Sequence, residues 1–157
     1  MRTTDLADEL TRERAAFLDA LSSVASESMT TPGLVGEWSA RELIAHLGYW
    51  AGHATEAIHA VEQGRADEFD PGGLDVEAIN RTVARVARST ELATVRRREA
   101  ASVEALVERL RVMDPALLDT VLPDGDTLAD AIREDGPGHY REHAAELRRT
   151  LGDGPHD

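Results

Sequence analysis

The sequence contains no cysteine, and this absence excludes several kinds of site. Without thiols the chain can form no disulfide bond, no thiolate zinc site and no cysteine nucleophile. A bound metal ion would therefore have to be held by histidine, aspartate or glutamate side chains.

Long hydrophobic runs are also absent. Residues 1–5 read Met-Arg-Thr-Thr-Asp and lack the apolar stretch of a signal peptide. No segment approaches the roughly 18 uninterrupted apolar residues that a membrane-spanning helix needs. We therefore expect a cytoplasmic protein with no membrane partner.

Positive charge and aromatic residues are both scarce. The 17 basic residues, all of them arginine, face 30 acidic ones, so that the formal net charge is −13. A strongly acidic chain is a poor partner for nucleic acid or for anionic membrane surfaces. Aromatic residues make up 4% of the chain and leave the apolar positions to alanine and leucine, which favours helices.

The length and the hydrophobic content are typical of one globular domain. The chain has 157 residues, of which 41% are hydrophobic and 30% are charged. This is enough for a substantial core. We expect a single domain over residues 1–151 and a flexible tail over residues 152–157, where glycine and proline interrupt the pattern.

Four amphipathic stretches predict an all-α fold. Apolar residues recur at helical spacing over about residues 5–25, 39–64, 75–113 and 128–151. We expect the third stretch to be one long element with a kink or short break near Ser89. The fourth is expected to be kinked or broken at Gly136-Pro137-Gly138. With no strand pattern or repeat, the sequence predicts a four-helix bundle of up-down or crossover topology.

The second stretch has the best-marked helix start in the chain. Ser39, followed three residues later by Glu42, predicts a capping box, in which each side chain binds the other residue's backbone N–H. Trp38 and Leu43 predict a hydrophobic staple around it. With the helix phase set in this way, His46 falls within the apolar stripe. A buried imidazole needs a polar partner, because an unsatisfied buried polar group costs roughly 1–3 kcal/mol.

The last stretch supplies two further histidines. His139 and His143 are four residues apart, so both rings project from one face of a helix and can share one metal ion. Together with His46 they predict a metal centre with three imidazole ligands and at least one open coordination position. His53 lies on nearly the same face as His46, but a rise of roughly 10.5 Å is too great for both to bind one ion.

Glu142 directly precedes His143 and is the candidate catalytic residue of this site. In a His-x-x-Glu-His segment the glutamate can act as a general base beside the metal or anchor one of its ligands. The alternative is a solvated position on the outer face of the helix. The sequence leaves both open.

Two segments resemble the DinB-like superfamily. They are residues 38–47, which carry the Trp-Ser-x-x-Glu-Leu-x-x-His-Leu pattern, and residues 139–143, which read His-Tyr-Arg-Glu-His. The superfamily includes the damage-inducible bundles and the N-terminal domain of mycothiol-dependent maleylpyruvate isomerase. The resemblance implies a four-helix bundle, often a homodimer, that holds a divalent ion with one ligand from the second helix and two from the last. Those positions correspond to His46, His139 and His143.

A neighbouring branch offers a metal-free alternative. Residues 75–80 and 138–140 are similar to the colibactin self-resistance proteins. Those proteins share the fold and act on cyclopropane electrophiles without a metal. For this chain the similarity implies a bundle in which the histidines bind a small molecule directly or bind one another.

The residues and the resemblance together imply a small enzyme that depends on a divalent metal ion, with zinc or nickel as the expected ion. It would catalyse hydrolysis or thiol transfer on a small electrophilic molecule, and a low-molecular-weight thiol is the expected partner of the transfer reaction. The alternatives are a metal-free binding or self-resistance bundle and a structural dimer without catalytic activity.

Overall fold

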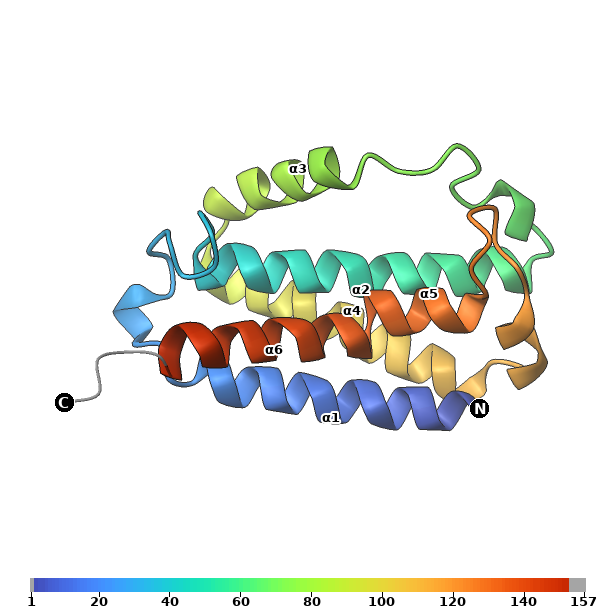
Figure 1. Cartoon of the computed structure of the whole chain (residues 1–157), viewed down its shortest axis with the longest axis horizontal. Coiled ribbons are helices and arrows are strands. Elements are labelled where there is room, and N and C mark those ends of the chain that lie inside the picture. Colours follow the sequence, from blue (N-terminus) through green and yellow to red (C-terminus); the bar gives the residue numbers. More distant parts are fainter. Residues whose placement is uncertain (1, 153–157) are drawn as a thin grey trace.

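The computed structural model describes residues 2–152, which form an all-helical fold (Figure 1). Six α-helices follow one another along this part of the chain, and no strand occurs in it. They are α1 (Thr3–Leu21), α2 (Ala40–Glu62), α3 (Val76–Arg88), α4 (Leu92–Val112), α5 (Leu128–Asp135) and α6 (Pro137–Gly152). Three short 3₁₀ turns lie at Ser26–Ser28, Ala66–Glu68 and Pro115–Asp119. The prediction of an all-α fold is confirmed.

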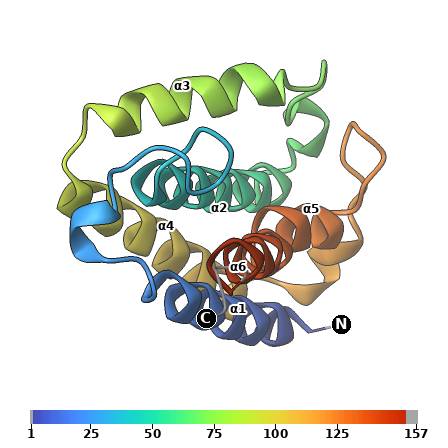
Figure 2. The same cartoon turned by 60° about the vertical axis from the view of Figure 1, so that its left-hand side comes forward.

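Five of the six helices enclose the hydrophobic core, and α3 lies outside it. The buried apolar cluster draws its members from α1, α2, α4, α5, α6 and the loops between them, and none from α3. Both views place α3 against α2, on the side remote from α1 (Figures 1 and 2). The core is thus formed by five helices, of which α5 and α6 together correspond to the fourth predicted stretch, and α3 lies on its outer side.

The third predicted stretch is two helices rather than one. α3 ends at Arg88, α4 begins at Leu92, and the chain turns back between them (Figure 1). The break near Ser89 was expected, but the single long element was wrong. The hydroxyls of Ser89 and Thr90 both donate to the carbonyl oxygen of Val86, at 3.2 and 2.7 Å. These side-chain bonds compete with helical backbone bonds and end α3.

The last stretch is broken at Gly136, as predicted. α5 ends at Asp135 and α6 starts at Pro137, a position where the missing N–H of proline costs no helical hydrogen bond. A Cβ atom on Gly136 would lie 2.8 Å from the carbonyl oxygen of Ile132, so this close approach requires glycine. Of the predicted tail, Gly152 belongs to α6, and residues 153–157 lie outside the described part of the chain.

The capping box at the start of α2 forms as predicted. The backbone N–H of Glu42 donates to the Ser39 hydroxyl at 3.4 Å, and the backbone N–H of Ser39 donates to the Glu42 carboxylate at 2.5 Å. Both side chains are fully buried. The box therefore fixes where α2 begins and which way its side chains face.

A buried ion pair joins α1 to α4. The guanidinium of Arg14 binds both carboxylate oxygens of Glu99, with Nε–O distances of 2.7 and 3.0 Å. Glu99 is 3% exposed and lies where α2 comes closest, since a Cβ on Gly48 would be 2.9 Å from the Glu99 Cα. A carboxylate in such a place is tolerated only while it is paired.

His53 links α2 to the end of α5 and to the loop that follows α2. Its Nδ1 lies 2.7 Å from Asp135 at the end of α5, and its Nε2 lies 2.8 Å from Asp70. Burial lowers the pKa of His53, but the hydrogen bonds and charges of Asp135 and Asp70 outweigh it and raise the pKa above its ordinary value. The protonated imidazole can donate to both carboxylates at once.

None of the helices described over residues 2–152 has the length and apolar character needed to cross a membrane.

Replacing Arg14 with methionine is expected to lower the free energy of unfolding by about 3–5 kcal/mol, because it leaves the Glu99 carboxylate buried and unpaired. Urea denaturation at pH 7 measures the loss. Arg12→Met, on the exposed side of the same helix, is the matched control and should change stability little. The double variant Arg14→Met/Glu99→Met should recover much of the loss; a double variant no more stable than Arg14→Met would contradict the argument.

Replacing His53 with glutamine is expected to destabilise the fold more at pH 6 than at pH 9. Because the folded-state pKa is raised, the stabilisation is complete below the ordinary pKa of about 6.5 and disappears as the pH rises through the folded value. A loss of about 1–3 kcal/mol at pH 6 is typical of hydrogen bonds to charged groups. Urea denaturation at the two pH values, with the exposed His59→Gln as control, tests this; an equal loss at both would contradict it.

Candidate metal centre

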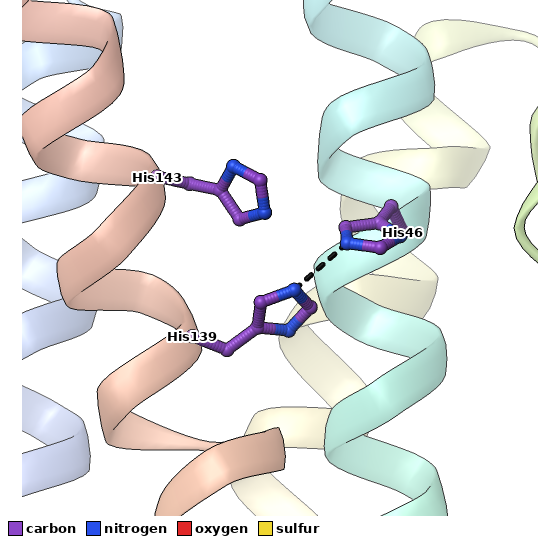
Figure 3. Close-up of side chains that lie close together, drawn as sticks. All are labelled: His46, His139 and His143. Atoms are coloured by element: carbon purple, nitrogen blue, oxygen red, sulfur yellow. Dashed lines mark hydrogen bonds between the residues drawn. The ribbon is translucent and has the colours of Figure 1, made fainter. Parts of the chain in front are cut away.

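Three histidines from two helices point toward one another between α2 and α6 (Figure 3). His46 comes from the second turn of α2, and His139 and His143 lie one turn apart near the start of α6. The capping box sets the phase of α2, and the break at Gly136 sets the start of α6. The structure thus brings together the three residues that the sequence singled out.

The distances between the rings leave little room at the centre of the triad. The Nε2 atoms of His46 and His139 are 2.8 Å apart, which is a hydrogen-bond distance. One available nitrogen from each of the three residues lies within 4.8 Å of the others. Two imidazole nitrogens on one tetrahedral zinc ion, each about 2.0–2.1 Å from the metal, are separated by about 3.3 Å. Small movements of the two rings would therefore convert the hydrogen-bonded arrangement of His46 and His139 into one that holds a metal ion.

The protein environment keeps two of the imidazoles neutral. Burial, and secondly the charge of His143, lowers the pKa of His46 to about 4, although the side chain of Asn80 opposes the shift. Burial, followed by the charges of His46 and His143, lowers the pKa of His139 to about 3. A neutral imidazole keeps the lone pair that a metal ion requires.

Aromatic and amide groups surround His46. The ring of Trp38, just before the capping residue, lies 4.8 Å from the His46 ring, centroid to centroid. One turn beyond His46, the indole N–H of Trp50 donates to the Asn80 side-chain oxygen at 2.9 Å. Asn80 belongs to α3, so the helix outside the core reaches the edge of the triad. The sequence analysis did not predict this contact.

The Glu146 carboxylate lies beside His143. Its Oε1 lies 3.6 Å from Nδ1 of His143 and is buried without a hydrogen-bond partner among residues 2–152. A carboxylate on the outer nitrogen of a ligating histidine orients the ring and makes it a stronger ligand. Sequence reasoning missed Glu146; the signal was the spacing of three residues from His143, which places both on one side of a helix.

Glu142 lies elsewhere. Its side chain is exposed, and it is not among the residues whose ligand atoms converge. Its role as a general base stays a prediction. His53 is likewise outside the triad, occupied by Asp70 and Asp135.

The donor set fits a divalent metal ion. The Nε2 atoms of His46 and His139 face each other, and one ligand atom from each of the three residues lies within 4.8 Å of the others. The ring nitrogens that converge are thus neutral imidazole donors for His46 and His139, the form that binds a metal ion. Imidazole nitrogen suits zinc, nickel, cobalt and iron, so these three side chains could hold any of these ions.

Comparison with known proteins gives one match. Residues 10–145 match the family model of the mycothiol maleylpyruvate isomerase N-terminal domain. No curated protein and no solved structure matches the chain. Because the matched segment covers most of the chain, the protein belongs to the mycothiol maleylpyruvate isomerase N-terminal domain family, which is a DinB-like family.

Proposed function

We propose that this protein is a small enzyme that binds a divalent metal ion through His46, His139 and His143 and carries out hydrolysis or thiol transfer on a small electrophile. One observation carries the proposal: three imidazoles from α2 and α6 converge, with ligand atoms within 4.8 Å, in a setting that lowers the pKa of two of them. Such an arrangement is costly for a fold unless a ligand uses it.

Three protein ligands leave a coordination position free for water or a thiol. When bound, a zinc-type ion lowers the pKa of water to about 7 and so supplies a nucleophile at neutral pH. The chain's own residues would set the geometry: the Glu146 carboxylate, 3.6 Å from Nδ1 of His143, would orient that ring electrostatically, while Trp38 packs on His46. Glu142 is proposed as the residue that moves the proton; its side chain is exposed and directly precedes His143 in the sequence of α6.

A hollow farther along α2, lined by His53 and by none of the three histidines of the triad, offers room for a small molecule. It measures about 250 Å³ and is lined in part by Trp50, Phe69 and Asp135. Trp50 is one turn beyond His46 on α2, and Asp135 is the last residue of α5, just before the break that leads into α6. The hollow therefore lies along α2 from the triad and not at the metal centre itself.

The family match supports further expectations. The family's description names a thiol, mycothiol, and so favours a low-molecular-weight thiol as partner. We infer that α1, α2, α4 and the α5–α6 pair act as the framework of a four-helix bundle, with residues 1–151 as one domain, and that the protein is a homodimer. Zinc or nickel is the proposed ion.

The second candidate is a metal-free bundle that binds or sequesters a small molecule. The hydrogen bond between His46 and His139 favours it, since two imidazoles that satisfy each other need no ion. In this case the neutral rings would bind the ligand through their remaining nitrogens. The two candidates differ in metal content.

Untagged protein purified without chelator is expected to contain close to one divalent ion per chain, and elemental analysis identifies the ion. His143→Ala should lose it, because two imidazoles bind far more weakly than three. His59→Ala, which changes an exposed histidine of α2, is the matched control and should retain the ion. Metal-free wild-type protein that also fails to bind added zinc or nickel would overturn the proposal in favour of the metal-free bundle.

Glu146→Gln is expected to weaken metal binding about 10- to 100-fold, which is typical of the loss of a carboxylate behind a ligating histidine. Competition against a fluorescent chelator measures the affinity. Glu142→Gln serves as the comparison on the same helix and should bind metal as tightly as the wild type. Metal binding by Glu146→Gln as tight as that of the wild type would mean that Glu146 does not support the site.

A further inference from the structure

A groove on the far side of α2 is separate from the metal centre. It lies between α2, α3 and α4 and encloses about 300 Å³ (Figure 2 shows the three helices). Gly48 of α2 lines it, and this residue is two positions beyond His46. At about 100° per residue the two positions face nearly opposite directions, so the groove and the histidine triad use different sides of the helix.

The walls of the groove are mainly apolar. Val83, Val86 and Ala87 come from α3, Val95 from α4 and Ala45 from α2. Val86 is 50% exposed although it belongs to the apolar face of α3. This face stays open because α3 packs on α2 without joining the core. A ligand with an apolar body would remove this surface from water.

One cation at the groove is free. Arg98 lines it and forms no hydrogen bond or ion pair within residues 2–152. The carboxylate of Glu99 also borders the groove, but Arg14 holds both its oxygens. The local charge of the groove is therefore positive.

The surrounding sequence reinforces that charge. Residues 80–98 contain one carboxylate, Glu91, in a chain whose formal net charge is −13. The same residues contain six of the 17 arginines, namely Arg81, Arg85, Arg88, Arg96, Arg97 and Arg98. All six are exposed. A local cluster of positive charge on an acidic protein attracts anions to that part of its surface.

We propose that this groove is a second binding site, for a small anionic amphiphile: a molecule with an apolar body and a carboxylate head. The body lies against the valines and alanines, and the head binds the guanidinium of Arg98, which can hold a carboxylate with two hydrogen bonds. The volume is at the lower limit of small-molecule sites and fits such a molecule rather than a protein segment. Cationic amphiphiles are repelled by the same arginines.

The test is isothermal titration calorimetry with decanoate as the probe. Wild-type protein should bind decanoate saturably and should not bind decyltrimethylammonium, which has the same chain and the opposite charge. Arg98→Gln should weaken decanoate binding about tenfold or more, since it removes a charged hydrogen-bond donor. Arg97→Gln, the neighbouring exposed arginine outside the groove, is the matched control and should bind like the wild type. Val83→Phe, which fills the groove, should abolish binding.

Several results would overturn the proposal. Equal losses in Arg98→Gln and Arg97→Gln would show that decanoate responds only to the general charge of this part of the surface. Loss of decanoate binding in His143→Ala would place decanoate at the metal centre. Retention of binding in that variant would show that the groove is separate from the proposed metal site. Sedimentation that shows dimers in the wild type and monomers in Val83→Phe would make the groove an interface between two copies. Circular dichroism checks that each variant is folded. If Val83→Phe does not fold, the test rests on the difference in decanoate binding between Arg98→Gln and Arg97→Gln.

Discussion

The orientation of α2 about its axis is the constraint on which the rest of the structure depends. The buried capping box between Ser39 and Glu42 fixes this orientation at the first turn. From there His46 faces α6, Gly48 faces α4 and His53 faces the end of α5. A rotation of α2 by one residue, about 100°, would remove all three contacts at once. The candidate metal centre, the close approach of Gly48 to α4 and the contacts of His53 with Asp70 and Asp135 therefore all depend on the orientation of α2.

The triad illustrates how burial prepares a site. An imidazole in water would be partly protonated at neutral pH, with a pKa of about 6.5. Desolvation lowers this to about 4 for His46 and about 3 for His139, and so keeps their lone pairs available for metal coordination. The same desolvation leaves the outer Nδ1 atoms without partners, which weakens the fold. A bound ion would offset this loss of stability by joining the rings through metal–nitrogen bonds.

The two ends of α2 serve different chemistries. Near its start are the histidine triad and, on the opposite side of the helix, the arginine-rich groove between α3 and α4. Toward its end are His53, two carboxylates and an acidic hollow. α3 takes part in both, since Val76 lines the hollow while Val83 and Val86 line the groove. A helix outside the core can do this because its apolar face is not consumed by core packing.

Most of the local structure could be predicted from the sequence. The capping box, the helical stretches and the interruption at Gly136 are encoded within one or two turns of chain. His46, His139 and His143 could be chosen because helical spacing places each on an inward stripe. The reversal at Ser89 could not be predicted, because a kinked long helix and a tight turn satisfy the same pattern until the packing of α3 on α2 selects one of them.

The sequence by itself determined that this protein is helical, where its helices begin and which histidines face inward. Only the tertiary structure decided what those side chains meet: Glu146 behind His143, Asp70 and Asp135 on either side of His53, and Arg14 on Glu99. The physical reason is the distance along the chain over which each interaction acts. Hydrogen bonds within a helix and its caps link residues a few positions apart, whereas contacts between helices depend on packing distances and angles that all the side chains set together.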